Sequence, residues 1–236
     1  MITPRYVSFF LVTLSLCSSG TFFAQENGDG FYTAIDSTGK QLVVSSEERG
    51  KGQDFVEPSA EISAFIEKIN ALLDEGFPSD EVLRLLENEA PTLAQLEPYT
   101  FFSDKGYMRN LIHKTADYDL LLMCWGPGQQ TPVHGHEGQR GWIVVLDGKL
   151  EFTDYQEEPE GSGKLVSEVA VNVGQAGDAG GPAGIHVVAN VFDTPAISLH
   201  FYSLPFDQCE VYDLELNETR KVPLVYNTIR GKMMQP

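Results

Sequence analysis

The sequence predicts a mainly β domain preceded by a helical segment. Between Ile62 and Leu73, apolar residues recur at spacings of three and four, which is the period of an amphipathic helix. After Tyr107, short apolar or β-branched runs alternate with Gly, Pro, Asp and Asn, as in strands joined by turns. Several short strands of this kind favour a sandwich or a barrel, and a hydrophobic content of 42% is that of a globular protein.

The N-terminal residues differ in composition from the rest of the chain. Arg5 precedes an apolar run over Val7–Cys17, and small or polar residues follow, which is the order of regions in a secretory signal peptide. We expect residues 1–24 to be a signal peptide and the protein to be exported, either to the periplasm or outside the cell. The alternative is a buried or mis-started segment on a cytoplasmic protein. Residues 25–58 are polar and charged, and we expect a linker there with one short strand at Gln41–Ser45.

The helical segment follows this linker. The apolar positions of its first helix are Ile62, Phe65, Ile66, Ile69, Leu72 and Leu73. The sequence Glu75–Pro78 ends that helix, because Gly and Pro interrupt helical backbone. A second helix is expected to begin at Ser79, and Pro91 and Pro98 bound shorter helical or turn segments.

Six strands are expected in the second half of the chain. Their ranges are Asp119–Trp125, Gly141–Leu146, Lys149–Tyr155, Ser167–Val173, Ile185–Asn190 and Ala196–Ser203. The pair Asp147-Gly148 joins two of them, since Asp-Gly supplies the positive φ values of a type I′ hairpin turn. Cys124 lies in the first strand, where a buried thiol acts as a small hydrophobic side chain. Cys124 and Cys209 alone make no disulfide framework, so the fold depends on its core.

The charge balance excludes one class of partner. The formal net charge is −18 and the isoelectric point is about 4.5, so a phosphate backbone would be repelled and nucleic acid is not expected to bind. The apolar run near the N-terminus is too short to span a bilayer comfortably, so no membrane span is expected. We expect a monomer that acts on small molecules.

Two histidines one residue apart stand behind a Gly-rich turn, in Gly128-Gln-Gln-Thr-Pro-Val-His134-Gly-His136. In an extended strand, residues i and i+2 point to the same face, so both imidazoles are aimed at one point. His186 is the nearest downstream candidate for a third ligand. Three such ligands suit a transition metal and leave coordination positions open, which is typical of a catalytic site. The alternative is two core or surface histidines with a coincidental third.

Two further groups of polar side chains are suited to chemistry. Tyr107 and Arg109 lie just before the first long strand. Ser198, His200 and Tyr202 alternate along a later strand, so all three face the same side. A hydroxyl, an imidazole and a phenol in a row form a hydrogen-bond relay that can fix and polarise the phenol O–H. The plainer alternatives are a surface ion pair for Arg109 and an ordinary aromatic strand residue for Tyr202.

Taken together, these motifs resemble the cysteine dioxygenases, which are thiol dioxygenases of the cupin superfamily. The resemblance runs from about Ala60 to near Asp213. It rests on Tyr107-x-Arg109-Asn110, Leu122-Met-Cys-Trp125-Gly-Pro-Gly128, His134-x-His136, Gly184-x-His186-x3-Asn190 and Ser198-x-His200-x-Tyr202. It implies a cupin fold over residues 59–236, which is a double-stranded β-helix or jelly-roll barrel with an N-terminal helical segment.

The resemblance also implies a metal and a reaction. Ferrous iron, Fe(2+), is expected to be held by His134, His136 and His186. Many cupins add a glutamate ligand four or five residues after the second histidine, but Arg140 and Gly141 occupy those places here. The thiolate and amine of L-cysteine are expected to chelate the iron, and O2 takes the remaining position. Both oxygen atoms then pass to sulfur, which gives cysteine sulfinate.

The remaining site residues are assigned from the same resemblance. Arg109 is expected to hold the substrate carboxylate, because its planar fork matches a carboxylate bidentately. Tyr107 supports Arg109 or lines the pocket. Tyr202, oriented by His200 and Ser198, donates a hydrogen bond to the substrate or the reacting oxygen.

Two positions depart from the mammalian pattern. Gly141 stands where mammalian enzymes carry a cysteine that is crosslinked to the tyrosine equivalent to Tyr202. The crosslink therefore cannot form here, as in many bacterial members. Leu204 replaces the first proline of the mammalian Tyr-Ser-Pro-Pro-Phe, which leaves open how Tyr202 is presented and which thiol is preferred.

Two other functions stay open at this point. One is a dioxygenase for 3-mercaptopropionate or another small thiol. Relatives of that kind tend to carry Gln at the position of Arg109, so the arginine favours cysteine. The other is a metal-containing cupin that binds a ligand without catalysis. The relay of Ser198, His200 and Tyr202 argues against it, since a protein that only binds has no need of one.

Overall fold

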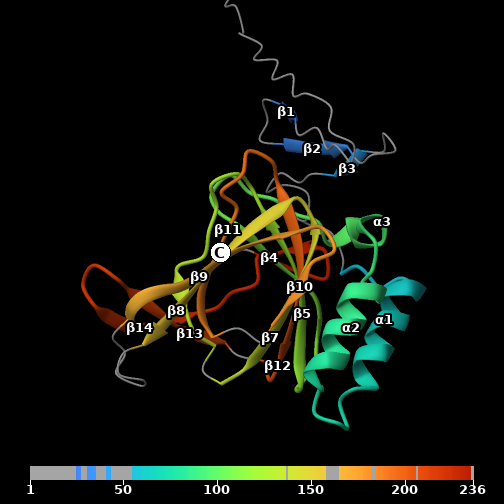
Figure 1. The fold of residues 1–236 in the computed structure, drawn as a ribbon. Coiled ribbons are helices and arrows are strands. Elements are labelled where there is room, and N and C mark those ends of the chain that lie inside the picture. The colour runs from blue at the N-terminus through green and yellow to red at the C-terminus, as the bar shows by residue number, and fades with distance from the viewer. Residues whose placement is uncertain are drawn as a thin grey trace, which may run out of the picture.

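Two β-sheets, with a layer of helices against one of them, make up the body of the protein (Figure 1). The computed structural model describes residues 55–136, 138–157, 165–181, 184–205 and 207–234, and the backbone of three short strands before them. These strands form an antiparallel sheet of their own and are β1 (Gln25–Asn27), β2 (Phe31–Ile35) and β3 (Gln41–Val43). The predicted linker thus contains three strands where the sequence predicts one. The predicted signal peptide, residues 1–24, lies outside the described residues.

The helical layer packs through one apolar face. It consists of α1 (Ala60–Asn70), α2 (Ser79–Glu89), α3 (Leu93–Leu96) and a single 3-10 turn, η1 (Glu97–Tyr99). The first helix begins at Ser59, whose hydroxyl accepts a hydrogen bond from the Ile62 N–H at 3.3 Å, as an N-cap does. It ends earlier than the apolar pattern predicts. Beyond Asn70 the backbone tightens to three-residue bonds, from Leu72 N–H to Ile69 O and from Leu73 N–H to Asn70 O.

The strands of the two main sheets pair in a non-sequential order, so the chain crosses between them. The seven-stranded sheet runs β10-β7-β12-β5-β4-β15-β16, and the six-stranded sheet runs β14-β13-β6-β11-β8-β9. The first contains β4 (Met108–Lys114), β5 (Tyr118–Trp125), β7 (Arg140–Asp147), β10 (Ala179–Gly180), β12 (Ala196–Ser203), β15 (Thr228–Ile229) and β16 (Lys232–Met233). The second contains β6 (Val133–His134), β8 (Lys149–Glu157), β9 (Leu165–Gln175), β11 (Ile185–Ala189), β13 (Gln208–Asp213) and β14 (Glu218–Pro223).

This arrangement confirms the predicted class, a mainly β cupin-like double-stranded β-helix with N-terminal helices. All six predicted strands are present, with bounds that differ by no more than two residues. The predicted hairpin at Asp147-Gly148 is wrong: these residues join β7 to β8, but the two strands belong to different sheets and do not pair. Gly148 has a positive φ of +71° and Asp147 does not, so the connection is a tight crossing between the sheets and not a type I′ turn. The sequence did not predict β4, which carries Arg109 and Asn110 within it and so lacks the apolar pattern of a buried strand.

The interior strands are buried on both faces. Every residue of β5 and of β12 is buried, because one face of each strand packs on the helical layer and the other faces the space between the sheets. In β12 the residues in the core beneath the helices are Ile197, Leu199 and Phe201. The alternate residues, Ser198, His200 and Tyr202, therefore face the interior of the barrel, as predicted.

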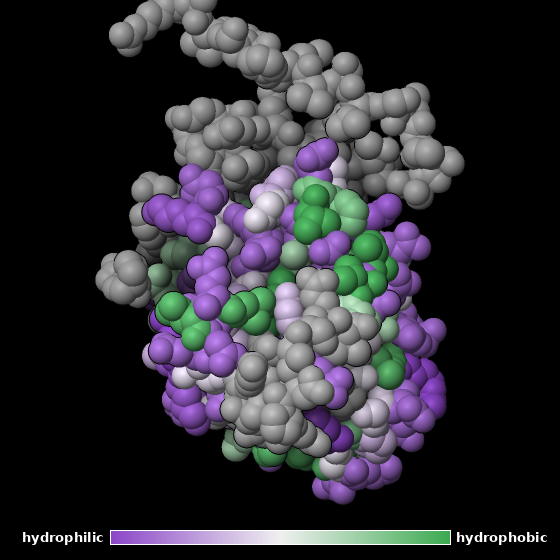
Figure 2. Space-filling view, turned by 60° about the vertical axis from the view of Figure 1, so that its left-hand side comes forward, coloured by the Kyte–Doolittle hydropathy of each residue, from purple (hydrophilic) through white to green (hydrophobic). Residues whose placement is uncertain are grey.

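The face of the molecule in Figure 2 is largely hydrophilic. Hydrophobic side chains occur on it in small separate groups. Among the described residues, no helix has both the length and the hydropathy needed to cross a membrane.

Candidate metal centre

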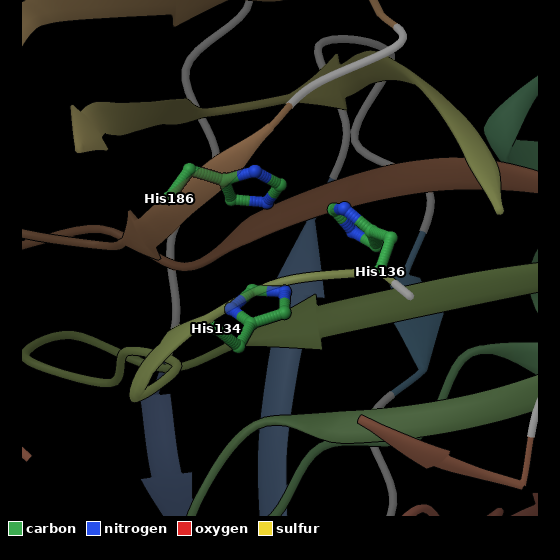
Figure 3. A group of neighbouring side chains, drawn as sticks. All are labelled: His134, His136 and His186. Carbon is green, nitrogen blue, oxygen red and sulfur yellow. The ribbon is translucent and has the colours of Figure 1, made fainter. Parts of the chain in front are cut away.

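Three histidines, two of them in strands of the six-stranded sheet and one just beyond the end of a strand, meet in the barrel interior. His134 ends β6, His136 follows two residues later, and His186 lies in β11 directly opposite His134 in the antiparallel ladder. The rings point toward one another (Figure 3), and their ligand nitrogens all lie within 4.8 Å of one another. The structure therefore brings together the three residues that the sequence predicts. His136 reaches the cluster from beyond the end of β6, not from within a strand as the spacing predicts.

Hydrogen bonds at the far side of two rings fix their orientation. His134 Nδ1 lies 3.0 Å from Pro132 O, and His186 Nδ1 lies 3.2 Å from Gly184 O. A neutral imidazole that donates through Nδ1 presents the Nε2 lone pair to a metal. Burial, strengthened by the neighbouring imidazoles, lowers the pKa of His134 to about 4 and that of His186 to about 2. Both rings are therefore neutral at pH 7 and can act as ligands.

The donor set is composed of nitrogen alone in the part of the chain that the structure describes, which does not include Glu137. Arg140, at the place where many cupins carry a glutamate, turns away and donates to the backbone oxygens of Gly76 and Phe77. Three imidazoles fit a mid-row transition metal and leave room for exogenous ligands.

A hydrogen-bonded chain leads from the core to Tyr202. Trp125 Nε1 donates to Ser198 Oγ at 2.9 Å, Ser198 Oγ lies 2.8 Å from His200 Nε2, and His200 Nδ1 lies 3.0 Å from the Tyr202 hydroxyl. Indole N–H can only donate, so the Ser198 oxygen accepts from Trp125. We assign the serine proton to the bond with His200 Nε2, the acceptor that lies within reach. A neutral His200 then carries its proton on Nδ1 and donates it to the Tyr202 oxygen. The Tyr202 proton is thereby directed away from His200.

Burial sets the protonation of this chain. It lowers the pKa of His200 well below the ordinary value, and the positive charge of Arg109 acts in the same direction. Burial also raises the pKa of Tyr202 to about 12, although a hydrogen bond from Arg109 opposes that shift. At neutral pH the relay therefore holds a neutral imidazole and a protonated phenol. Leu204, with φ at +62°, follows the last residue of β12. Tyr202 lies within the strand, and its side chain faces the barrel interior.

Gly141 is required for the position of the Tyr202 ring. The two residues are opposite each other in the β7–β12 ladder. A Cβ atom on Gly141 would lie 2.8 Å from Tyr202 Cε1 and 3.0 Å from Cδ1, well inside ordinary carbon contact. Any larger residue at this position must displace the ring or shift the backbone of β7.

Arg109 and Tyr107 line a cavity of about 290 Å³ that includes His134, His186 and Tyr202 in its wall. The Tyr107 ring stacks on Trp125 with centroids 4.7 Å apart. The Nε of Arg109 is buried and has no hydrogen-bond partner among the described residues. Because a buried guanidinium N–H without a partner is costly, this atom indicates a place for an anionic ligand.

A second cavity, of about 380 Å³, reaches the histidines from another side. It is lined by Phe152, Asp154 and Asn172 among others, and it shares His186 and Tyr202 with the first. Asp154 is directly opposite His186 in the β8–β11 ladder, so it faces the same interior. The sequence did not single out this acid, because one aspartate in a half-buried strand has no pattern to distinguish it.

Sequence reasoning also missed two parts of the first cavity. Nothing in the motif that contains Trp125 signals that its indole N–H begins the chain to Tyr202. Residues 222–225 and Asn227 form one wall of the cavity, and their sequence contains no motif that signals this. Cys209, buried in β13, also lines it, and within the described residues neither Cys124 nor Cys209 forms a disulfide.

Comparison with solved structures finds partial matches to cupin-type folds. One is an uncharacterized conserved protein with a double-stranded β-helix domain from Klebsiella pneumoniae, with a TM-score of 0.39, 19% identity, and coverage of 46% of this chain and 86% of that one. Another is an RmlC-like cupin protein from Desulfovibrio desulfuricans, with a TM-score of 0.35, 24% identity, and coverage of 44% and 89%.

Comparison with known sequences is more specific. Cysteine dioxygenase type 1 of Rattus norvegicus is 30% identical over 169 residues, which cover 68% of this chain and 84% of the relative. The Homo sapiens protein of the same name is 29% identical over 156 residues, covering 64% and 78%. The family described as cysteine dioxygenase type I matches residues 54–215, which include all three histidines, Arg109 and the relay. The chain therefore belongs to the cysteine dioxygenase type I family, within the cupin superfamily.

Proposed function

We propose that this thiol dioxygenase family member oxidises L-cysteine with O2 to cysteine sulfinate. The observation that carries the proposal is the place of Arg109, whose buried Nε lacks a partner among the described residues and lies in the same cavity as His134 and His186. A small substrate with a thiol at one end and a carboxylate at the other matches both features at once. Cysteine has both groups.

We propose that the three-histidine site holds ferrous iron, to which its neutral imidazoles and open positions are suited. When bound, Fe(2+) supplies the redox centre at which a thiolate and O2 react. Sulfur is oxidised from a thiol to a sulfinic acid, and both atoms of O2 are consumed, so no external reductant is needed.

The side chains around the metal have separate roles in this proposal. Arg109 binds the substrate carboxylate, and Tyr107 forms the adjoining wall of the cavity. Tyr202 donates a hydrogen bond toward the reacting groups, and His200 and Ser198 hold its hydroxyl in place through the relay. Because position 141 is glycine, which has no sulfur, we infer that Tyr202 works as an unmodified phenol.

The test is aerobic incubation of the iron-loaded protein with cysteine, cysteamine and 3-mercaptopropionate, with sulfinate and O2 uptake measured for each. We expect cysteine to give the highest kcat/KM and sulfinate to form in proportion to the O2 consumed. A higher kcat/KM for 3-mercaptopropionate would assign the protein to that substrate instead. The absence of sulfinate from all three thiols, with iron bound, would refute the dioxygenase function.

Two arginine variants separate the role of Arg109 from a general charge effect. Arg109→Gln is expected to raise the KM for cysteine at least tenfold, because the carboxylate loses a charge-assisted, bidentate partner. Arg220→Gln removes the same charge from an exposed position on β14 and is expected to leave KM unchanged. Equal KM values for cysteine in the two variants would contradict the assignment of Arg109.

We also propose that the protein is exported after removal of residues 1–24 and acts as a monomer. N-terminal sequencing of the mature protein and its mass in solution test these two points. An intact Met1 in a soluble cytosolic fraction would exclude export.

A further inference from the structure

The first part of the C-terminal segment, which we define as residues 222–234, forms one wall of the cavity that holds Arg109. Val222, Pro223, Leu224, Val225 and Asn227 all line it. The family match ends at residue 215, so this wall lies beyond the part of the chain that identifies the family. The metal ligands and the wall facing them therefore come from different parts of the sequence.

Asn227 is hydrogen-bonded to both the backbone N–H and the backbone C=O of Arg109. Its side-chain Oδ1 accepts a hydrogen bond from the Arg109 N–H at 2.7 Å, and its own N–H donates to Arg109 O at 2.9 Å. Together these two bonds tie Arg109 to the C-terminal segment on the side of β4 that faces away from β5. The side-chain NH2 and the backbone C=O of Asn227 take no part in these two bonds.

The chemistry of the position explains why an amide side chain stands there. β15 pairs in parallel with β4, and its first partner is Thr228, opposite Asn110. Arg109 lies one residue before this ladder, where β15 offers no backbone carbonyl to its N–H. The Asn227 side chain supplies the missing acceptor. Alanine has no acceptor, so the Arg109 N–H would lose its partner and the strand its anchor at this residue.

Asn227 is itself fixed by bonds on both sides. The Met234 N–H donates to Asn227 O at 2.9 Å. On one flank the Tyr226 hydroxyl donates to Asp119 at 2.6 Å, and on the other the Arg230 N–H donates to Leu111 O at 2.8 Å. The two hydrogen bonds to Arg109 therefore come from a segment that is itself hydrogen-bonded to β4 and β5.

We propose that Asn227 is a positioning residue for substrate recognition, which sets the place of the Arg109 guanidinium through the Arg109 backbone. The inference rests on the proposed function in one respect, namely that Arg109 takes the substrate carboxylate. Asn227 acts through Arg109 and does not touch the reacting atoms. Its loss should weaken recognition of the carboxylate and leave the metal site intact.

Steady-state kinetics of Asn227→Ala in the iron-loaded protein test this proposal. We expect the KM for cysteine to rise about tenfold with kcat within twofold of wild type, because a guanidinium displaced by a fraction of an ångström loses its alignment with the carboxylate. In an Arg109→Gln background the same substitution should change kcat/KM by less than twofold, since the two residues act as one unit. Full additivity of the two losses would overturn the proposal.

Thr228→Val is the matched control. Thr228 is the next residue of the segment, is fully buried, and donates from its hydroxyl to Asn110 Oδ1 at 3.0 Å, so its side-chain hydrogen bond goes to the residue after Arg109. The variant loses one hydrogen bond of the same segment and keeps the shape of the side chain. We expect its KM for cysteine to stay within twofold of wild type. A rise equal to that of Asn227→Ala would mean that any loosening of the segment has this effect, and would overturn a specific role for Asn227.

Anaerobic binding separates this proposal from the proposed reaction. Calorimetry with the iron-loaded protein should show that Asn227→Ala weakens cysteine binding about tenfold and leaves cysteamine, which has no carboxylate, within twofold. This result supports the positioning role even if no sulfinate forms in air, in which case only the proposed reaction fails. Equal weakening for both thiols would refute the positioning role.

Discussion

Replacement of Gly141 by alanine tests whether the place of the Tyr202 ring matters for turnover. The added Cβ would lie 2.8 Å from Tyr202 Cε1, whereas carbon atoms pack at about 3.5–4.0 Å. The ring must therefore retreat by roughly 0.7 Å. It is buried, it packs with Leu111 and Leu121, and its hydroxyl is bonded to His200 at 3.0 Å. It cannot retreat without disturbing these contacts.

The structure sets the size of the expected effect. Overpacking of a filled interior costs about 1–3 kcal/mol of unfolding free energy, and misplacement of a reacting group by 1 Å can cost about a hundredfold in rate. For Gly141→Ala we expect kcat for sulfinate formation to fall about tenfold or more. Iron content should not change, because the same Cβ would lie 3.8 Å from His136 Nε2, which is an ordinary contact.

The assay compares iron content, thermal midpoint and kcat in Gly141→Ala and Gly180→Ala. A Cβ at Gly180 has no atom within 4 Å, and Gly180 pairs with β7 only two residues away, opposite Ile143. Gly180→Ala should behave as wild type in all three measurements. A wild-type kcat in Gly141→Ala would show that the Tyr202 ring has room or no role. A kcat lost together with the iron would show that the effect reaches the metal and not the tyrosine.

Three further perturbations address the metal and the relay. His186→Ala removes one of three nitrogen ligands and should lower the iron content of the purified protein tenfold or more, whereas near-stoichiometric iron by metal analysis would contradict the three-ligand site. Ser198→Ala removes the donor that fixes the His200 tautomer, so kcat should fall about tenfold at unchanged iron content, and an unchanged kcat would mean that the relay does not orient Tyr202. Burial lowers the pKa of His200. Below about pH 6.5 the unfolded chain therefore binds a proton at this histidine that the folded protein does not, so the free energy of unfolding falls as the pH falls. In urea titrations without metal, wild type should lose about 1.4 kcal/mol more than His200→Gln between pH 7.5 and pH 5.5, and equal losses would refute the assignment.

The parts of the site that follow from local geometry could be predicted from the sequence. Ser198, His200 and Tyr202 share a face because side chains alternate along any strand, and this needs no knowledge of distant contacts. The convergence of His134 and His186 depends on the pairing of β6 with β11, which the sequence does not specify. The prediction that these two histidines converge rests on the family motifs and not on the alternation of side chains along one strand.

The missed elements have separate physical causes. β4 carries Arg109 and Asn110 within it because Arg109 lines the site, so the hydrophobic period that signals a strand is weak there. β13 is a strand of only six residues, in which Cys209 and Val211 line the site and the exposed residues at both ends are polar. β15 has only two residues, and its parallel partner β4 lies more than a hundred residues earlier. Strand pairs of this kind are specified by the whole fold, and a local pattern cannot reveal them.

The bond between Arg109 and Asn227 has a consequence for how the protein is made. It joins residues 118 positions apart, and Asn227 follows His186, the last of the three histidines, in the sequence. Synthesis proceeds from the N-terminus at about 5–20 residues per second, and contacts between distant residues form late in folding. The three histidines are therefore all synthesised while the wall opposite them does not yet exist. A nascent chain can assemble its metal ligands first, and the cavity gains the wall that is bonded to Arg109 only when residues 222–227 have been added.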